Sequence, residues 1–131
     1  MANLTDQVQS ADWKAEKHVP VIECSDQVKA DDGLKITVTV GKEIAHPNTT
    51  EHHIRWLALF FQPEGDKFTY EIGRFECNAH GESAQGPNTG SVYSEPVFTV
   101  NAKISKSGSL QALSYCNIHG LWQSAKDIQV V

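Results

Sequence analysis

A five-residue motif that combines a thiol with an imidazole occurs twice in this sequence. The pattern C-N-x-H-G spans residues 77–81 and again residues 116–120. Cysteine thiolates and histidine imidazoles are ligands for iron, copper and zinc, and a C-x-x-H spacing allows both side chains to reach one ion. Three interpretations follow from the residues: both copies bind one metal, a single copy binds it, or the similarity is accidental.

The chain offers further side chains that could bind such a metal, with three cysteines and six histidines in all. They are Cys24, Cys77, Cys116, His18, His46, His52, His53, His80 and His119. Four groupings are possible: a tetrahedral zinc site made by both copies of the motif, a blue-copper site, a site with one cysteine and several histidines, or scattered histidines that bind no metal. The zinc site leaves several histidines without a role. A blue-copper site would need an axial ligand other than Met1, the only methionine.

The histidines in the first half of the chain lie in segments that favour extended backbone. His18 precedes a proline by two residues, and His46 directly precedes another, which biases it away from the α region. Asn48 and the threonines after it predict a tight turn that brings the chain back towards His46. Because neighbouring side chains of an extended chain point to opposite sides, we expect only one of His52 and His53 to face a shared metal.

Composition and charge restrict the class of protein. The 131 residues, of which 40% are hydrophobic and 21% charged, predict a single domain spanning residues 1–131 with its own core. A net charge of -5 argues against binding to nucleic acid. No apolar run is long enough to span a bilayer, and the N-terminal segment has no apolar signal region, so we expect no membrane association and a cytoplasmic protein. An odd number of cysteines argues against a disulfide framework.

Alternation of apolar and polar residues predicts a chain built of β-strands. The predicted strands are residues 34–40, 54–62, 68–77, 96–105, 110–116 and 124–131. The run 54–62 is the most apolar and is expected to be a central strand. No segment has a long helical period, so the expected fold class is an all-β sandwich. Two longer loops, 41–53 and 78–95, are the expected places for function.

Three segments together resemble the superoxide reductase family, which includes the neelaredoxins and the core domain of desulfoferrodoxin. They read "EKHVP" from residue 16, "HPNTTEHH" from residue 46 and "YCNIHG" from residue 115; "HGES" and "GPNT" in the long loop add to the resemblance. The similarity covers nearly the whole chain. It implies an immunoglobulin-like β-sandwich of about seven strands, in agreement with the strand pattern.

The resemblance also implies a metal centre with one iron ion per chain, held by four imidazoles and one thiolate. Carried over by motif, the iron ligands are His18, His46, His52, His119 and Cys116. Glu16 is implied as a sixth ligand of the ferric ion, and Lys17 beside it as a cation that attracts the substrate anion. The second copy of the motif thus carries the metal, and the first copy is a coincidence.

The remaining candidate ligands fall outside the implied iron site. His53 is expected to point away from the metal, and His80 is expected to be a loop histidine that hydrogen-bonds to the backbone. Cys24 and Cys77 are expected to be ordinary small side chains. Longer members of the family hold a second iron with four cysteines in an N-terminal domain; because no cysteine precedes Cys24, that second centre is not expected.

By resemblance, the chain is an enzyme, an oxidoreductase that reduces superoxide by one electron to hydrogen peroxide at a non-haem iron with an open sixth position. The implied electron donor is rubredoxin or a similar small iron protein, and the implied assembly is a homotetramer. Three other functions are weighed against it: a cupredoxin-like electron carrier, a zinc-stabilised β-domain and a superoxide dismutase. The identity of the metal and the products formed from superoxide would separate these functions.

Overall fold

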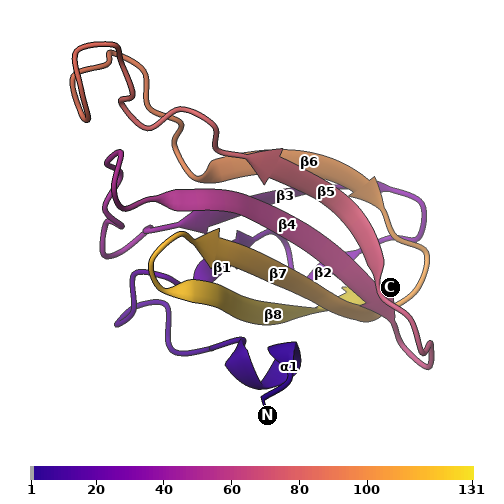
Figure 1. Cartoon of the computed structure of the whole chain (residues 1–131). Helices are drawn as coiled ribbons and strands as arrows, with labels where there is room; N and C mark the ends of the chain where they lie inside the picture. Colours follow the sequence, from indigo (N-terminus) through magenta and orange to yellow (C-terminus); the bar gives the residue numbers. More distant parts are fainter. Residues whose placement is uncertain (1) are drawn as a thin grey trace.

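The computed structural model describes residues 2–131, which form two β-sheets packed against each other (Figure 1). The elements are α1 (Leu4–Gln7), β1 (Pro20–Glu23), β2 (Gln27–Val28), β3 (Gly33–Val40), β4 (Ile54–Pro63), β5 (Tyr70–Glu76), β6 (Val97–Lys103), β7 (Gly108–Cys116) and β8 (Gly120–Val130). The smaller sheet has the order β1-β3-β6, and the larger has the order β2-β8-β7-β4-β5. The predicted all-β sandwich is confirmed, with eight strands described where about seven were expected.

The residue pattern does not predict β1 and β2, which are four and two residues long. Segments this short hold too few residues to show an alternation of apolar and polar side chains. They become strands through tertiary pairing: β1 runs antiparallel to the second half of β3, and β2 runs parallel to the end of β8. The other strands lie where they are predicted, although β8 begins at Gly120, directly after the second copy of the motif.

The core lies between the sheets and has the composition that the alternation predicts. The buried residues of β3 are Leu34, Ile36, Val38 and Val40. On the larger sheet, β4 pairs with both β5 and β7 and contributes Leu57 and Leu59, which are completely buried. On the outer side of β3, Thr37 hydrogen-bonds to Thr99 of β6 at 2.9 Å. This paired and packed framework fixes the ends of the strands from which the site is built.

One end of the sandwich gathers the segments that carry the predicted ligands (Figure 1). The turn between β7 and β8 lies at this end, as does the loop 41–53 that leads into β4 (Figure 1). The chain between β5 and β6, residues 77–96, extends beyond the sheets on the same side (Figure 1). Within residues 2–131, no helix is both long and apolar enough to cross a membrane.

Candidate metal centre

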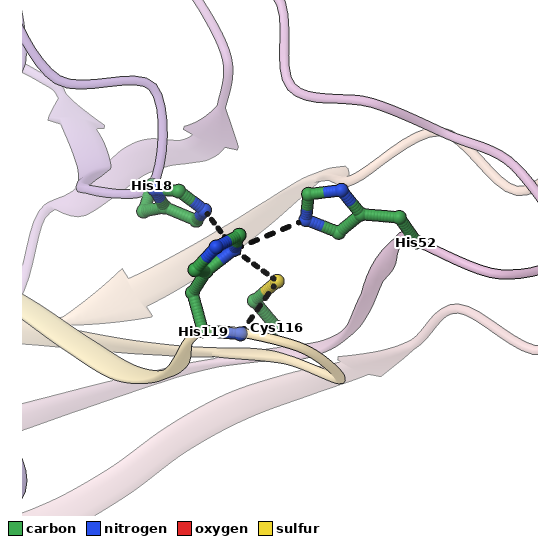
Figure 2. Close-up of side chains that lie close together, drawn as sticks. All are labelled: His18, His52, Cys116 and His119. Carbon is green, nitrogen blue, oxygen red and sulfur yellow. Dashed lines mark hydrogen bonds between the residues drawn. The ribbon is translucent and has the colours of Figure 1, made fainter.

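Four predicted ligands from distant parts of the chain meet at one point. The ligand atoms of His18, His52, Cys116 and His119 all lie within 4.8 Å of one another (Figure 2). His18 comes from the segment before β1 and His52 from the loop before β4. Cys116 is the last residue of β7, and His119 lies in the turn between β7 and β8. In the part of the chain that the structure describes, this is the one such group of cysteine, histidine or acidic side chains.

The contacts inside this group do not behave as ordinary hydrogen bonds. Nδ1 of His119 lies 3.1 Å from Nε2 of His18, 3.2 Å from Nε2 of His52 and 3.8 Å from Sγ of Cys116. A ring nitrogen carries one proton or one lone pair, so it satisfies only one of these neighbours. Two nitrogens bound at about 2.1 Å to one metal ion, at right angles, lie about 3.0 Å apart. The spacing therefore fits ligands that surround one ion.

The ring of His46 lies beside this group, although His46 is not one of its four members. Its ring centroid lies 4.8 Å from that of His18 and 4.9 Å from that of His52. Nδ1 of His46 donates to the carbonyl oxygen of Pro47 at 2.6 Å, which leaves Nε2 with a lone pair. Among residues 2–131, that buried Nε2 has no hydrogen-bond partner. Burial lowers the pKa of His46 to about 4, so the imidazole is neutral near pH 7 and able to bind a metal.

His18 is held in place at the Nδ1 edge of its ring and on one face of the ring. Nδ1 of His18 lies 2.7 Å from a carboxylate oxygen of Glu16, and the same oxygen accepts the backbone N–H of His18 at 3.0 Å. The ring stacks on Trp122, with centroids 4.9 Å apart and planes 14° apart. A carboxylate on the second nitrogen fixes the tautomer of a metal-binding imidazole and raises its basicity. The residue pattern did not reveal the role of Trp122, because its contact with His18 exists only in the folded chain.

Cys116 supplies the sulfur from a completely buried position at the end of β7. Its Sγ accepts a hydrogen bond from the backbone N–H of His119 at 3.3 Å. Gly120 follows with a positive φ of 81°, a conformation that glycine adopts without strain and that lets the chain turn directly into β8. His119 itself is exposed, so the centre is open to solvent on this side.

Glu16 and Lys17 lie beside the centre, but the Glu16 carboxylate is not among the clustered ligand atoms. Burial acts to raise the pKa of Glu16, yet the hydrogen bonds from His18 outweigh it and the pKa is lower than usual. The charge of Lys17 contributes to the lowered pKa values of His46 and His52, although burial is the main cause for both. Lys17 is half-buried. Both residues are thus near the imidazoles, with Glu16 on the Nδ1 side of His18.

The first copy of the motif lies elsewhere. His53 stacks on His80 with ring centroids 3.4 Å apart and planes 10° apart, and its Nδ1 donates to the carbonyl of Thr49. Nδ1 of His80 bonds to the carboxylate of Glu82 at 3.3 Å, so its side chain does not bind the backbone as expected. Burial raises the pKa of Cys77 to about 11, which keeps it a neutral thiol. The structure therefore brings His52, and not His53, to the centre.

The fold and the centre define a class of protein: β-sandwiches in which a cluster of imidazoles and a single thiolate is suited to hold a metal ion. The family model for desulfoferrodoxin matches residues 10–125, and this chain belongs to the desulfoferrodoxin family. It is 60% identical over 125 residues to the neelaredoxin of Megalodesulfovibrio gigas, covering 95% of this chain and 96% of that protein.

Two further relatives extend the comparison. The superoxide reductase of Pyrococcus furiosus is 55% identical over 121 residues, which cover 92% of this chain and 95% of that protein. The solved structure of superoxide reductase (neelaredoxin) from Archaeoglobus fulgidus in the reduced form superimposes with a TM-score of 0.86 at 55% identity, covering 95% of this chain and 99% of that one.

Proposed function

We propose that this chain, as one iron-binding domain over residues 1–131, is a superoxide reductase with one iron ion per chain. The proposed ligands are His18, His46, His52, His119 and Cys116. The observation that carries the proposal is the convergence of four ligand atoms within 4.8 Å, with the ring of His46, whose buried Nε2 has no hydrogen-bond partner, beside His18 and His52. Ferrous iron bound there would supply one electron to superoxide, which takes up two protons and leaves as hydrogen peroxide.

The chain's own residues prepare this chemistry in different ways. The Cys116 thiolate would donate electron density to a bound iron, as a cysteine thiolate does in haem enzymes. An imidazole that binds a metal does so in its neutral form, so the net charge of the site would come from the metal and the thiolate. The exposed position of His119 leaves a path by which a small anion reaches the centre. Protons come from solvent water at this open side.

We assign to Lys17 the attraction of the superoxide anion. The protein carries a net charge of -5 and repels anions as a whole. A single positive charge about 4 Å from the anion contributes about 1 kcal/mol in water and about 4 kcal/mol at an effective dielectric constant of about 20. Such focusing raises association rates by roughly 10- to 1000-fold, and salt weakens it.

Glu16 has two proposed roles that belong to different arrangements of its side chain. In the arrangement described above it holds His18 through Nδ1. A metal would bind Nε2 on the opposite side of the ring, so binding of Glu16 to the ferric ion requires its side chain to rotate away from His18. Low-temperature EPR of the oxidised Glu16→Ala protein tests the second role, because a spectrum identical to that of the parent protein across the pH range would exclude Glu16 from the ferric site.

The proposal extends to the partners of the chain. The electron donor is rubredoxin or a similar small iron protein, the assembly is a homotetramer, and the location is the cytoplasm. Light scattering coupled to gel filtration tests the assembly, and stopped-flow oxidation of reduced rubredoxin in the presence of the enzyme and superoxide tests the donor.

The first experiment is EPR of the oxidised protein with the metal content measured on the same sample. A high-spin ferric signal close to one iron per chain is expected. A copper signal would favour the electron carrier, and stoichiometric zinc that iron cannot replace would favour a structural domain. With iron in place, the reductase forms one peroxide for each superoxide and no oxygen, whereas a dismutase forms one peroxide and one oxygen from two.

A further inference from the structure

Asn117 lies between two proposed ligands, Cys116 and His119, and makes contacts that the proposed iron site does not by itself require. Its side-chain Nδ2 donates to the carbonyl oxygen of Glu51 at 2.8 Å. Its Oδ1 accepts the backbone N–H of His53 at 2.9 Å. One carboxamide therefore binds the peptide groups on both sides of His52, the proposed ligand from the other loop.

This arrangement continues the strand pairing beyond the end of the sheet. The ladder between β4 and β7 ends with Ile54 opposite Cys116. One residue further, the backbone N–H of Asn117 still donates to the carbonyl of His53 at 3.2 Å. The carboxamide then takes the place of the next peptide group, since its planar amide both donates and accepts hydrogen bonds as a peptide does.

We infer that Asn117 is a positioning residue that fixes His52 relative to Cys116 and His119. Within its own loop, His52 is held only locally, by the Thr49 hydroxyl, which accepts its backbone N–H at 3.0 Å, and by the Thr49 backbone N–H, which donates to its carbonyl at 2.9 Å. Those bonds shape the loop but do not connect it to the turn that bears the thiolate. Asn117 makes that connection, and it places the ligands from two loops in one rigid frame.

The first copy of the motif provides the matched control. Asn78 follows Cys77 as Asn117 follows Cys116, but its side chain is exposed. Across residues 2–131, Asn78 makes no side-chain hydrogen bond, so the asparagine in this copy does not connect two loops. The difference between the two copies is therefore a difference in contacts and not in sequence.

The inference rests on the proposed metal centre, and the test measures the iron rather than the activity. Asn117→Ala removes both side-chain bonds, and Asn117→Leu removes them while keeping a similar volume. Iron release from the reduced protein to a ferrous chelator is measured at 25 °C, with low-temperature EPR of the oxidised protein and thermal unfolding on the same samples. Losing a group that orients a metal ligand typically costs about 10- to 100-fold in metal affinity.

We expect both Asn117 variants to release iron about 10- to 100-fold faster and to change the rhombicity of the ferric EPR signal, while Asn78→Ala matches the parent protein. An iron-release rate within about twofold of that of the parent, together with an unchanged EPR signal, would overturn the inference. This holds even if the variant is less stable to heat. A parent protein that retains no iron would overturn the proposed function together with this inference, so the two failures are distinguishable.

Discussion

The carboxylate of Glu16 provides a quantitative test of the proposed centre through the reduction potential of the iron. Glu16→Gln keeps an oxygen that can accept from His18 but removes one negative charge. The ferric ion carries one more positive charge than the ferrous ion, so a nearby carboxylate stabilises the ferric form more. Removing the charge therefore favours the ferrous form, and the midpoint potential rises.

The size of this rise follows from the geometry of His18. The Glu16 oxygen is 2.7 Å from Nδ1, and the width of the ring plus a metal–nitrogen bond of about 2.1 Å places the charge roughly 6.5 Å from the ion. One unit charge at that distance contributes about 2.5 kcal/mol at an effective dielectric constant of about 20 and about 0.6 kcal/mol in water. The Glu16 side chain is 30% exposed, so its interaction energy with the ion lies between these two values. For a one-electron couple the expected rise is about 30 to 110 mV.

The assay is a redox titration of the iron, followed by the absorption of the ferric protein at pH 7.5. The matched control is Glu82→Gln, because Glu82 binds His80 through Nδ1 just as Glu16 binds His18, but His80 lies outside the centre. We expect the control to leave the potential unchanged. A Glu16→Gln protein whose potential equals or falls below that of the parent would refute the reasoning, since both the positioning role and the ferric-ligand role of Glu16 require a rise.

Three further predictions address other parts of the molecule. Lys17→Ala should lower the second-order rate with superoxide by about tenfold at low salt, with less effect at high salt and an unchanged iron content, as pulse radiolysis would measure. Burial lowers the pKa of His46 to about 4 from 6.5, so between these pH values the unfolded chain binds a proton that the folded metal-free chain does not. The free energy of unfolding of the apoprotein should therefore fall as the pH drops from 6.5 to about 4. Denaturant titrations should show a smaller fall for the His46→Gln protein. Gly81→Ala should destabilise the protein by more than Gly65→Ala in the same assay: both have positive φ, but an added Cβ at Gly81 would overlap the ring of Tyr93, whereas Gly65 faces open space.

The sequence predicts much of this molecule because its signals are local. The strict alternation in β3 predicts both the strand and its buried face. The alternation of an extended chain also predicts that one member of the pair His52 and His53 faces the metal, and the cluster contains His52 alone. These inferences need only the geometry of neighbouring residues.

The contacts that hold the ligands in place were not predictable from the residue pattern. Trp122 stacks on His18 although the two are more than a hundred positions apart, and Asn117 reaches across to the loop of His52. The contact of Asn117 depends on the register between β4 and β7, and the contact of Trp122 depends on how β8 packs against the segment before β1; no single segment reveals either. The contact of Glu16 with Nδ1 of His18 joins residues that are close in the sequence. Whether the Glu16 carboxylate binds that nitrogen or the metal, however, depends on the folded site, and the spacing of the two residues does not decide it.

The two copies of the motif share one sequence pattern but have different surroundings in the folded chain. β5 and β7 flank β4 on opposite sides, and each copy begins at the end of one of them, so Cys77 and Cys116 lie beside the start of the same strand. The segment that leads into β4 contributes one histidine near each copy: His52 lies in the cluster with the second copy, and His53 stacks on the histidine of the first. The rings of His53 and His80 are nearly parallel and 3.4 Å apart, so their lone pairs lie in nearly parallel planes and do not point at one position. Within residues 2–131, no segment comparable to those of His18 and His46 completes a cluster of ligand atoms around them. The proposed metal site therefore belongs to the second copy because two other loops complete it there, and the motif alone is not sufficient.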